Sequence, residues 1–323
     1  MNKILLIFFG VLISISLSAQ EKYSWFELVD WNGYNRWSEY MIMSPGYMGP
    51  NALPVPEAGD GLIEQGIKLK TAVDLHFMNG DQTQNLFLQF DYPFLNNNIS
   101  VGFCVVPIEY YRLDNNIRDE RLARTADPHG FSGGDLYFWT NIQLIRNKLK
   151  WPDIRFRMAC RTASGGNLED ARFTDMPGYY FDISFGKSFY RNTDKNCWLR
   201  WYGMLGFYCW QTNVVNYSQN DAGLFAGGLK WQYHKILINN SVSGYIGYIG
   251  MKHQILIRNT SKPHVYSKDQ PVVYRFDIST RKGKYEYGFR FQQGLHDFKY
   301  STFRLSVSYF FRHIGVDNST DQG

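Results

Sequence analysis

Three arginines in one short run could together bind an anion. Arg155, Arg157 and Arg161 share one face of a stretch in which residue character alternates at every second position. Guanidinium groups bind carboxylates and phosphates through paired hydrogen bonds, so a row of them along a wall can pass an anionic solute from site to site. The opposite face of this stretch is apolar throughout and consists of Ile154, Phe156, Met158 and Cys160. This alternation indicates a β-strand with one oily face and one charged face.

Nearby carboxylates offer another interpretation of the arginine row. Asp135 and Asp182 fall on the two neighbouring predicted strands and could neutralise the guanidinium groups. We keep both interpretations open and prefer internal ion pairing to a dedicated anion path. The residues that we expect to line a solute path are Arg155, Arg157, Arg161, Asp135, Asp182, Arg275, Arg290 and Arg304. The other charged residues expected to face inward are Lys68, Lys70, Arg200, Lys230, Asp74, Asp91, Asp277 and Glu286.

The same alternation recurs along most of the chain and predicts its fold. Aromatic residues make up 17% of the 323 residues, more than a soluble core needs, and they suit the two interfacial girdles of a membrane barrel. We therefore predict an all-β fold, a transmembrane antiparallel β-barrel of about 12 strands spanning residues 66–311. The predicted strands are 66–77, 83–92, 99–111, 134–145, 154–161, 179–186, 197–211, 222–234, 236–250, 271–279, 284–293 and 301–311.

The connections between these strands alternate in length. Short turns such as 93–98 and 146–151 alternate with longer segments such as 112–133 and 162–177. Outer-membrane barrels show this pattern, with short periplasmic turns and long outer loops. An even number of strands then leaves both ends of the barrel in the periplasm.

The two ends of the chain have compositions unlike the barrel. Residues 1–20 combine Lys3, an apolar stretch and small residues, which predicts a signal peptide with the mature chain beginning near Gln20 or Glu21. Residues 21–65 are rich in tryptophan, proline and glycine, and we expect a periplasmic lead-in or a plug in the lumen, with a preference for partial plugging. Residues 312–323 form a polar tail that we expect in the periplasm. No later run of about 18 apolar residues occurs, and export combined with alternating strands indicates the outer membrane of a diderm bacterium.

The last strand ends in the aromatic sequence Tyr309-Phe310-Phe311. It resembles the C-terminal signal of outer-membrane barrels, except that a polar tail follows it here. We therefore expect outer-membrane lipid and the barrel-assembly machinery among the partners of this chain.

A central segment carries a family resemblance. The run Gly134-Asp-Leu-Tyr-Phe, the basic strand after it and the turn Thr162-Ala-Ser-Gly resemble the phenol-degradation MetA-like group of transporter-type outer-membrane barrels. The resemblance covers roughly residues 133–188 and implies a barrel that passes small, often hydrophobic compounds. It implies no catalytic residues.

Three classes of function remain open from the sequence. The preferred one is a channel or transporter-like barrel for small solutes, anionic or hydrophobic, and it is not an enzyme. The second is an outer-membrane lipid-modifying hydrolase, for which the candidates are Asp127, His129 and Ser132. The third is a closed structural or partner-binding barrel.

Other chemistries find little support in the sequence. A formal charge of +5 is too mild to argue for a nucleic-acid partner. The four cysteines lack CxxC spacing, which favours small apolar side chains over a metal site and leaves one disulfide open. Asn167 and Asp170 lack the ladder of alternating ligands that calcium loops use, so we expect neither a metal nor a cofactor.

Overall fold

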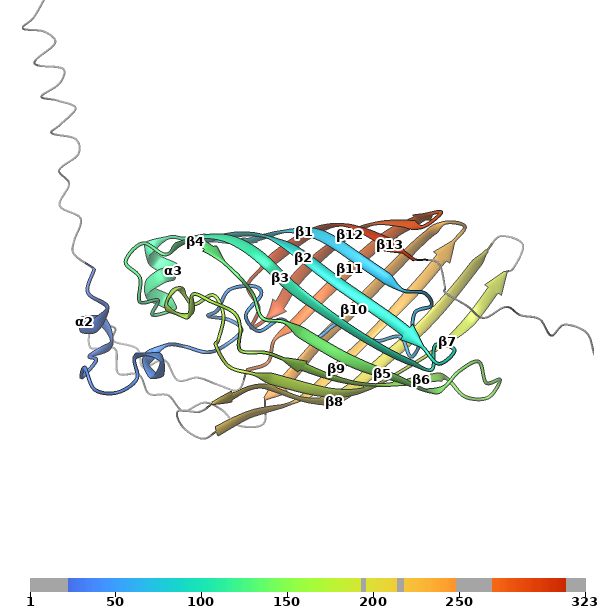
Figure 1. Cartoon of the computed structure of the whole chain (residues 1–323), viewed down its shortest axis with the longest axis horizontal. Coiled ribbons are helices and arrows are strands. Elements are labelled where there is room, and N and C mark those ends of the chain that lie inside the picture. Colours follow the sequence, from blue (N-terminus) through green and yellow to red (C-terminus); the bar gives the residue numbers. More distant parts are fainter. Residues whose placement is uncertain (1–22, 193–195, 214–217, 248–268, 312–323) are drawn as a thin grey trace, which may run out of the picture.

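The computed structural model describes residues 23–192, 196–213, 218–247 and 269–311. Short helical segments are few, and strands dominate (Figure 1). The helical segments are α2 (Trp25–Val29), η1 (Trp37–Tyr40), α3 (Asn115–Glu120) and η2 (Leu168–Asp170). The strands are β1 (Lys68–Met78), β2 (Asp81–Phe94), β3 (Ile99–Leu113), β4 (His129–Ser132), β5 (Tyr137–Ile145), β6 (Asp153–Arg161), β7 (Gly178–Asn192), β8 (Cys197–Asn213), β9 (Ser218–Tyr233), β10 (Ile236–Gly247), β11 (Val272–Lys282), β12 (Tyr285–His296) and β13 (Ser301–Phe310).

Twelve of these strands close into an antiparallel barrel. Each barrel strand pairs with its neighbour along the chain, and β1 pairs with β13 to complete the ring. The additional strand β4 pairs only with residues 109–112 of β3 and extends the sheet at one end of the barrel. The predicted twelve-stranded fold is confirmed, whereas β4 was not predicted because its four residues are too few to show an alternating pattern.

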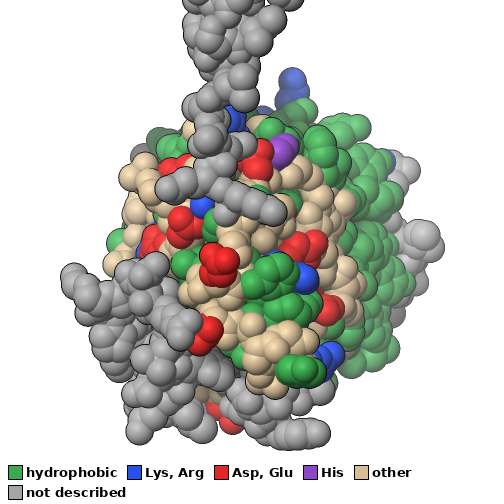
Figure 2. Space-filling view, turned by 90° about the vertical axis from the view of Figure 1, so that its left-hand side faces the viewer, with side chains coloured by type: hydrophobic (Ala, Val, Ile, Leu, Met, Phe, Trp, Pro, Cys, Tyr) green, Lys and Arg blue, Asp and Glu red, His purple; other side chains and the backbone are tan. Residues whose placement is uncertain are grey.

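The alternation of side chains follows from the two environments of the wall. Outward residues such as Val73 and Leu305 are 50% and 65% exposed, while the inward Asp74 next to Val73 is completely buried. A closed barrel satisfies every strand's backbone hydrogen bonds internally, so the outer face can be apolar and meet lipid. The hydrophobic flank is visible beside the polar end of the molecule in Figure 2. No helix among the described residues is long and apolar enough to cross a membrane.

The segment that precedes β1 runs through the barrel. Figure 1 shows α2 at the left end, where the long loops and α3 lie, whereas β1 begins at the right end with the short turns. Trp25 donates a hydrogen bond to the Leu122 carbonyl at the long-loop end, and Glu64 forms an ion pair with Lys68, the first residue of β1. Residues 41–64 therefore cross the lumen from one end to the other.

Strand β1 begins and strand β13 ends at the short-turn end, as an even number of barrel strands requires. Residues 23–40 lie at the long-loop end instead. Apolar residues of the segment find cover inside the barrel, where Met48 and Leu53 join a core with Tyr208 and Tyr245. Trp25, Val29, Ile42 and Leu122 form a second, smaller cluster at the long-loop end. The predicted signal peptide and C-terminal tail lie outside the described residues.

Candidate functional site

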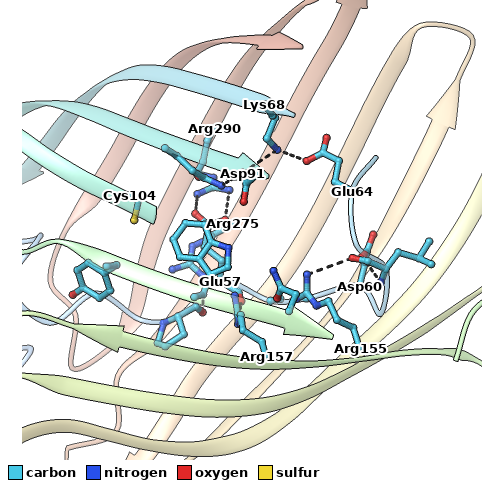
Figure 3. Close-up of a pocket in the computed structure, with 18 of the residues that line it drawn as sticks. Glu57, Asp60, Glu64, Lys68, Asp91, Cys104, Arg155, Arg157, Arg275 and Arg290 are labelled. Carbon is cyan, nitrogen blue, oxygen red and sulfur yellow. Dashed lines mark hydrogen bonds and ion pairs between the residues drawn. The ribbon is translucent and has the colours of Figure 1, made fainter. Parts of the chain in front are cut away.

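A cavity of about 790 Å³ occupies the lumen beside the crossing segment (Figure 3). Residues 50–64 of that segment, here called the strap, line one side of the cavity, and inward residues of the barrel line the other. Its lining includes Arg146, Arg191 and Trp198, which lie at the short-turn end. The cavity therefore extends towards that end of the barrel.

Strand β6 places its three arginines in different surroundings. Arg157 donates a hydrogen bond to Asp182 at 2.6 Å and is ion-paired with it. Arg161 lies 3.8 Å from Asp135 and also donates to the carbonyls of Ala52 and Met176.

Arg155 is the least neutralised of the three. Among the described residues it has no carboxylate within 4 Å, and it donates only to the Leu62 carbonyl, at 3.4 Å. The row therefore contains both ion pairs and one guanidinium without a carboxylate.

The remaining predicted path residues also face the lumen. Arg304 binds Asp74 through two hydrogen bonds, and Arg290 donates to Asp277 at 2.5 Å. Arg275 donates instead to neutral oxygens, with Gln292 at 2.7 Å and the Val55 carbonyl at 2.6 Å.

Asp135 and Asp182 have different surroundings. Asp135 precedes β5 and accepts hydrogen bonds from the backbone N–H groups of Ser164 and Gly165, whereas Asp182 lies on β7 opposite Arg157. The structure thus places all eight residues inside the barrel but distributes them around its wall.

Three acidic residues of the site were not predicted from the sequence. Glu57, Asp60 and Glu64 of the strap pair with Arg290, Lys230 and Lys68, respectively. The excess of basic over acidic residues predicted on the inward face was the available signal, because buried charges require partners. Three carboxylates within a proline- and glycine-rich stretch were the obvious source of them.

A network of buried charges crosses the long-loop end of the lumen. Arg172, on the loop after β6, pairs with Glu109 of β3 at 2.7 Å and with Asp81 of β2 at 3.0 Å. Arg121 pairs with the same Asp81 at 2.7 Å, and Tyr300 donates to it at 2.5 Å. Because none of these side chains is more than 1% exposed, the network fixes the loops to the barrel wall at this end.

This end of the molecule mixes charged and hydrophobic side chains where the described residues are visible. Figure 2 looks directly at it and shows acidic and basic side chains around a smaller hydrophobic patch.

The structure brings two of the three proposed hydrolase residues together, Asp127 and His129, but Ser132 lies apart from them. His129 and Ser132 are three positions apart on β4 and so lie on opposite faces of that strand, with His129 exposed and Ser132 buried. The Ser132 hydroxyl donates to the Gly133 carbonyl at 3.4 Å, and the His129 Nδ1 lies 3.3 Å from Asp127. This geometry contains no pair of nucleophile and base.

Metal-binding and disulfide geometry are also not found in the described part of the chain. No three His, Cys, Asp or Glu side chains there are grouped to hold a metal ion. Asn167 donates a hydrogen bond to the hydroxyl of Tyr111 on β3, and that hydroxyl donates to Asp170, so these contacts join the loop to the barrel wall. Cys104 and Cys160 form no disulfide.

Comparison with known proteins identifies the fold. No family model and no curated protein matches the sequence. An outer membrane channel from Pseudomonas putida F1 is similar in structure, with a TM-score of 0.52, 10% identity, and coverage of 79% of this chain and 100% of that chain. KdgM porin is also similar, with a TM-score of 0.44, 10% identity, and coverage of 75% of this chain and 99% of that chain. LpxR from Salmonella typhimurium is similar with a TM-score of 0.46, 10% identity, and coverage of 75% of this chain and 100% of that chain. The chain thus has the fold of outer-membrane β-barrels, in agreement with the resemblance to transporter-type barrels.

Proposed function

We propose that this barrel is an outer-membrane channel or transporter-like protein that passes small solutes and favours anions. The observation that carries the proposal is the cavity of about 790 Å³ inside a closed barrel whose wall presents Arg155, Arg157 and Arg275. A polar lumen within a lipid-facing barrel is the arrangement that channels of this architecture use. Fixed guanidinium groups on its wall would lower the electrostatic barrier for anions.

The strap must move for a solute to cross the whole barrel. It fills the lumen beside the cavity, and the buried network around Asp81 closes the long-loop end. We therefore propose gated passage, with the resting state shut.

A structural barrel with a permanently shut lumen is the second candidate. The contacts of Arg172 with Glu109 and Asp81 favour it, because a buried network of this kind resists opening. The two candidates differ in whether any conformation conducts.

Single-channel recording in planar lipid bilayers separates the two candidates. We expect brief, rare openings from the full-length protein and larger steady conductance from a variant lacking residues 21–64. The reversal potential in a salt gradient should show anion preference. Both Arg155→Gln and Arg157→Gln should weaken this preference, because each removes one positive charge and Arg157→Gln also leaves the Asp182 carboxylate unpaired. Absence of conductance in both the full-length and the shortened protein would contradict the channel proposal.

A further inference from the structure

The wall of the lumen contacts the main chain of the strap at successive positions. Arg161, Arg275 and Arg157 donate to the carbonyls of Ala52, Val55 and Glu57. Further along, Arg200, Gln143 and Arg155 donate to the carbonyls of Asp60, Gly61 and Leu62. The order of contacts follows the strap from the long-loop end towards the start of β1. Hydrogen bonds to carbonyl groups are independent of side-chain identity, so these contacts recognise the main chain of the strap.

A second set of contacts recognises acidic side chains. Glu57 pairs with Arg290, Asp60 pairs with Lys230 at 2.6 Å, and Glu64 pairs with Lys68. These three carboxylates are spaced three and four residues apart along the strap. Figure 3 shows Glu57, Asp60 and Glu64 reaching separate basic side chains around the cavity. The three basic groups lie on different strands, β12, β9 and β1, and each binds one carboxylate of the strap, so together they select an acidic polypeptide.

The strap also fits closely against the wall at its glycines. A Cβ atom on Gly59 would overlap the guanidinium group of Arg155, and one on Gly61 would overlap the Asp153 carbonyl. On the wall, a Cβ atom on Gly186 would overlap the Asp60 carbonyl. The wall at this point accepts a backbone and excludes side chains, which is the shape of a peptide-binding groove.

From these contacts we infer that the lumen wall is a binding site for an extended acidic polypeptide, and that the strap is its resident occupant. The inference rests on the proposed function, because it names an acidic peptide as a solute class for the same lumen. A small anion would engage one or two guanidinium groups. Five arginines instead each donate at least one hydrogen bond to a neutral carbonyl of the strap, over a path of several residues; they are Arg155, Arg157, Arg161, Arg200 and Arg275. A separate peptide would take the place of the strap when the strap withdraws.

The test uses the full chain with a weakened strap. The variant carries Glu57→Gln, Asp60→Asn and Glu64→Gln, which removes the three ion pairs and keeps every barrel residue. The probe is a fluorescent synthetic peptide with the sequence of residues 50–64, and its binding in detergent micelles is measured by anisotropy. We expect saturable binding to the variant, and at least tenfold weaker binding to the wild-type protein, whose own strap competes at high effective concentration.

Two control probes define the recognised chemistry. A peptide whose three carboxylates are replaced by amides should bind the variant at least tenfold more weakly, and a peptide carrying Gly61→Val should also lose affinity. Glutarate in millimolar excess should not displace the acidic peptide. Equal binding of acidic and amide peptides, or no saturable binding, would overturn the inference.

Folding and channel activity are measured on the same preparation. Heat-modified migration in gels reports whether the variant retains the barrel. Asp60→Asn alone, in the otherwise wild-type chain, provides a second variant that loses one strap contact and keeps Lys230 in the wall, and it should also bind more of the peptide than the wild-type protein does. Conductance without peptide binding would refute the peptide site and leave the channel intact. Peptide binding without conductance would refute the channel and leave the site.

Discussion

Asp81 accepts hydrogen bonds from four side chains at the long-loop end, those of Thr83, Arg121, Arg172 and Tyr300. Replacing it in Asp81→Asn leaves two buried guanidinium groups without their shared carboxylate. We expect the free energy of unfolding to fall by about 3–5 kcal/mol, the usual cost of breaking a buried ion pair. Urea-dependent unfolding from lipid vesicles measures this change.

A matched control distinguishes burial from charge. Asp119 pairs with Arg118 at 2.7 Å, but its side chain is 47% exposed. Asp119→Asn should cost less than about 1 kcal/mol because solvent screens an exposed pair. Equal losses from the two substitutions would show that the buried network does not stabilise the barrel in the way proposed.

A second residue links the crossing segment to a loop in a pH-dependent way. Burial raises the pKa of the Asp269 carboxyl to about 6, Ser44 donates a hydrogen bond to it at 2.6 Å and partly offsets the rise, and nearby Asp297 increases it. Since the folded pKa exceeds the unfolded one, the folded state prefers the protonated form. The resulting stability is fully present below about pH 4, and it is lost as the pH rises through about 6.

This shift predicts the effect of Asp269→Asn on a stability profile. The wild-type free energy of unfolding should decrease between pH 4 and pH 6, relative to the variant, by up to about 3 kcal/mol. Urea unfolding at several pH values measures the difference between the two proteins. Parallel profiles for wild type and variant would contradict the assignment.

At the scale of elements, the strands could be predicted and the course of the strap could not. In strands such as β12, successive side chains face lipid and lumen in turn, so the alternating residue types of 285–296 were enough to predict a strand. The strap has no such period, and its position depends on partners such as Arg290 and Lys230, far away in sequence. Similarly, the sequence predicted that Arg157 and Asp182 face the lumen, but whether the row conducts anions stays a prediction.

Two glycines test how tightly the strap is held. Gly33 and Gly61 both have positive φ, +78° and +83°, but only at Gly61 would a Cβ atom meet the wall, whereas nothing lies within 4 Å of the Gly33 position. Gly33→Val should cost about 1 kcal/mol through backbone strain. Gly61→Val adds steric overlap with the wall, so we expect it to detach the strap and raise the open fraction in bilayer recordings several-fold above that of Gly33→Val.

Limited proteolysis measures independently whether the strap is detached in the same pair of variants. Cleavage within residues 50–64 should be faster in Gly61→Val than in Gly33→Val or wild type. Identical cleavage rates and open fractions would mean that the strap is not held by its contact with the wall.

At the scale of the whole molecule, the segment that crosses the lumen places residues 23–40 at the opposite end of the barrel from the short turns. Residues 23–40 lie with α3 at the long-loop end, and the turns of the opposite end include residues 146–152 (Figure 1). Outer-membrane barrels expose long loops outward and short turns to the periplasm. We therefore expect the chain to pass through its own barrel, with residues 23–40 displayed on the cell surface.

Cysteine labelling of intact cells tests this orientation. Tyr34 and Leu149 are 95% and 91% exposed and belong to opposite ends of the barrel, so they form a matched pair. In a background with the four native cysteines replaced by alanine, a membrane-impermeant maleimide should label Tyr34→Cys on intact cells. Leu149→Cys should react only after the outer membrane is permeabilised, because its turn faces the periplasm. Labelling of Leu149→Cys but not of Tyr34→Cys on intact cells would mean that the barrel has the opposite orientation in the membrane. Labelling of neither residue on intact cells would mean that residues 23–40 are not displayed, and the strap would then have to enter the lumen from the periplasmic side.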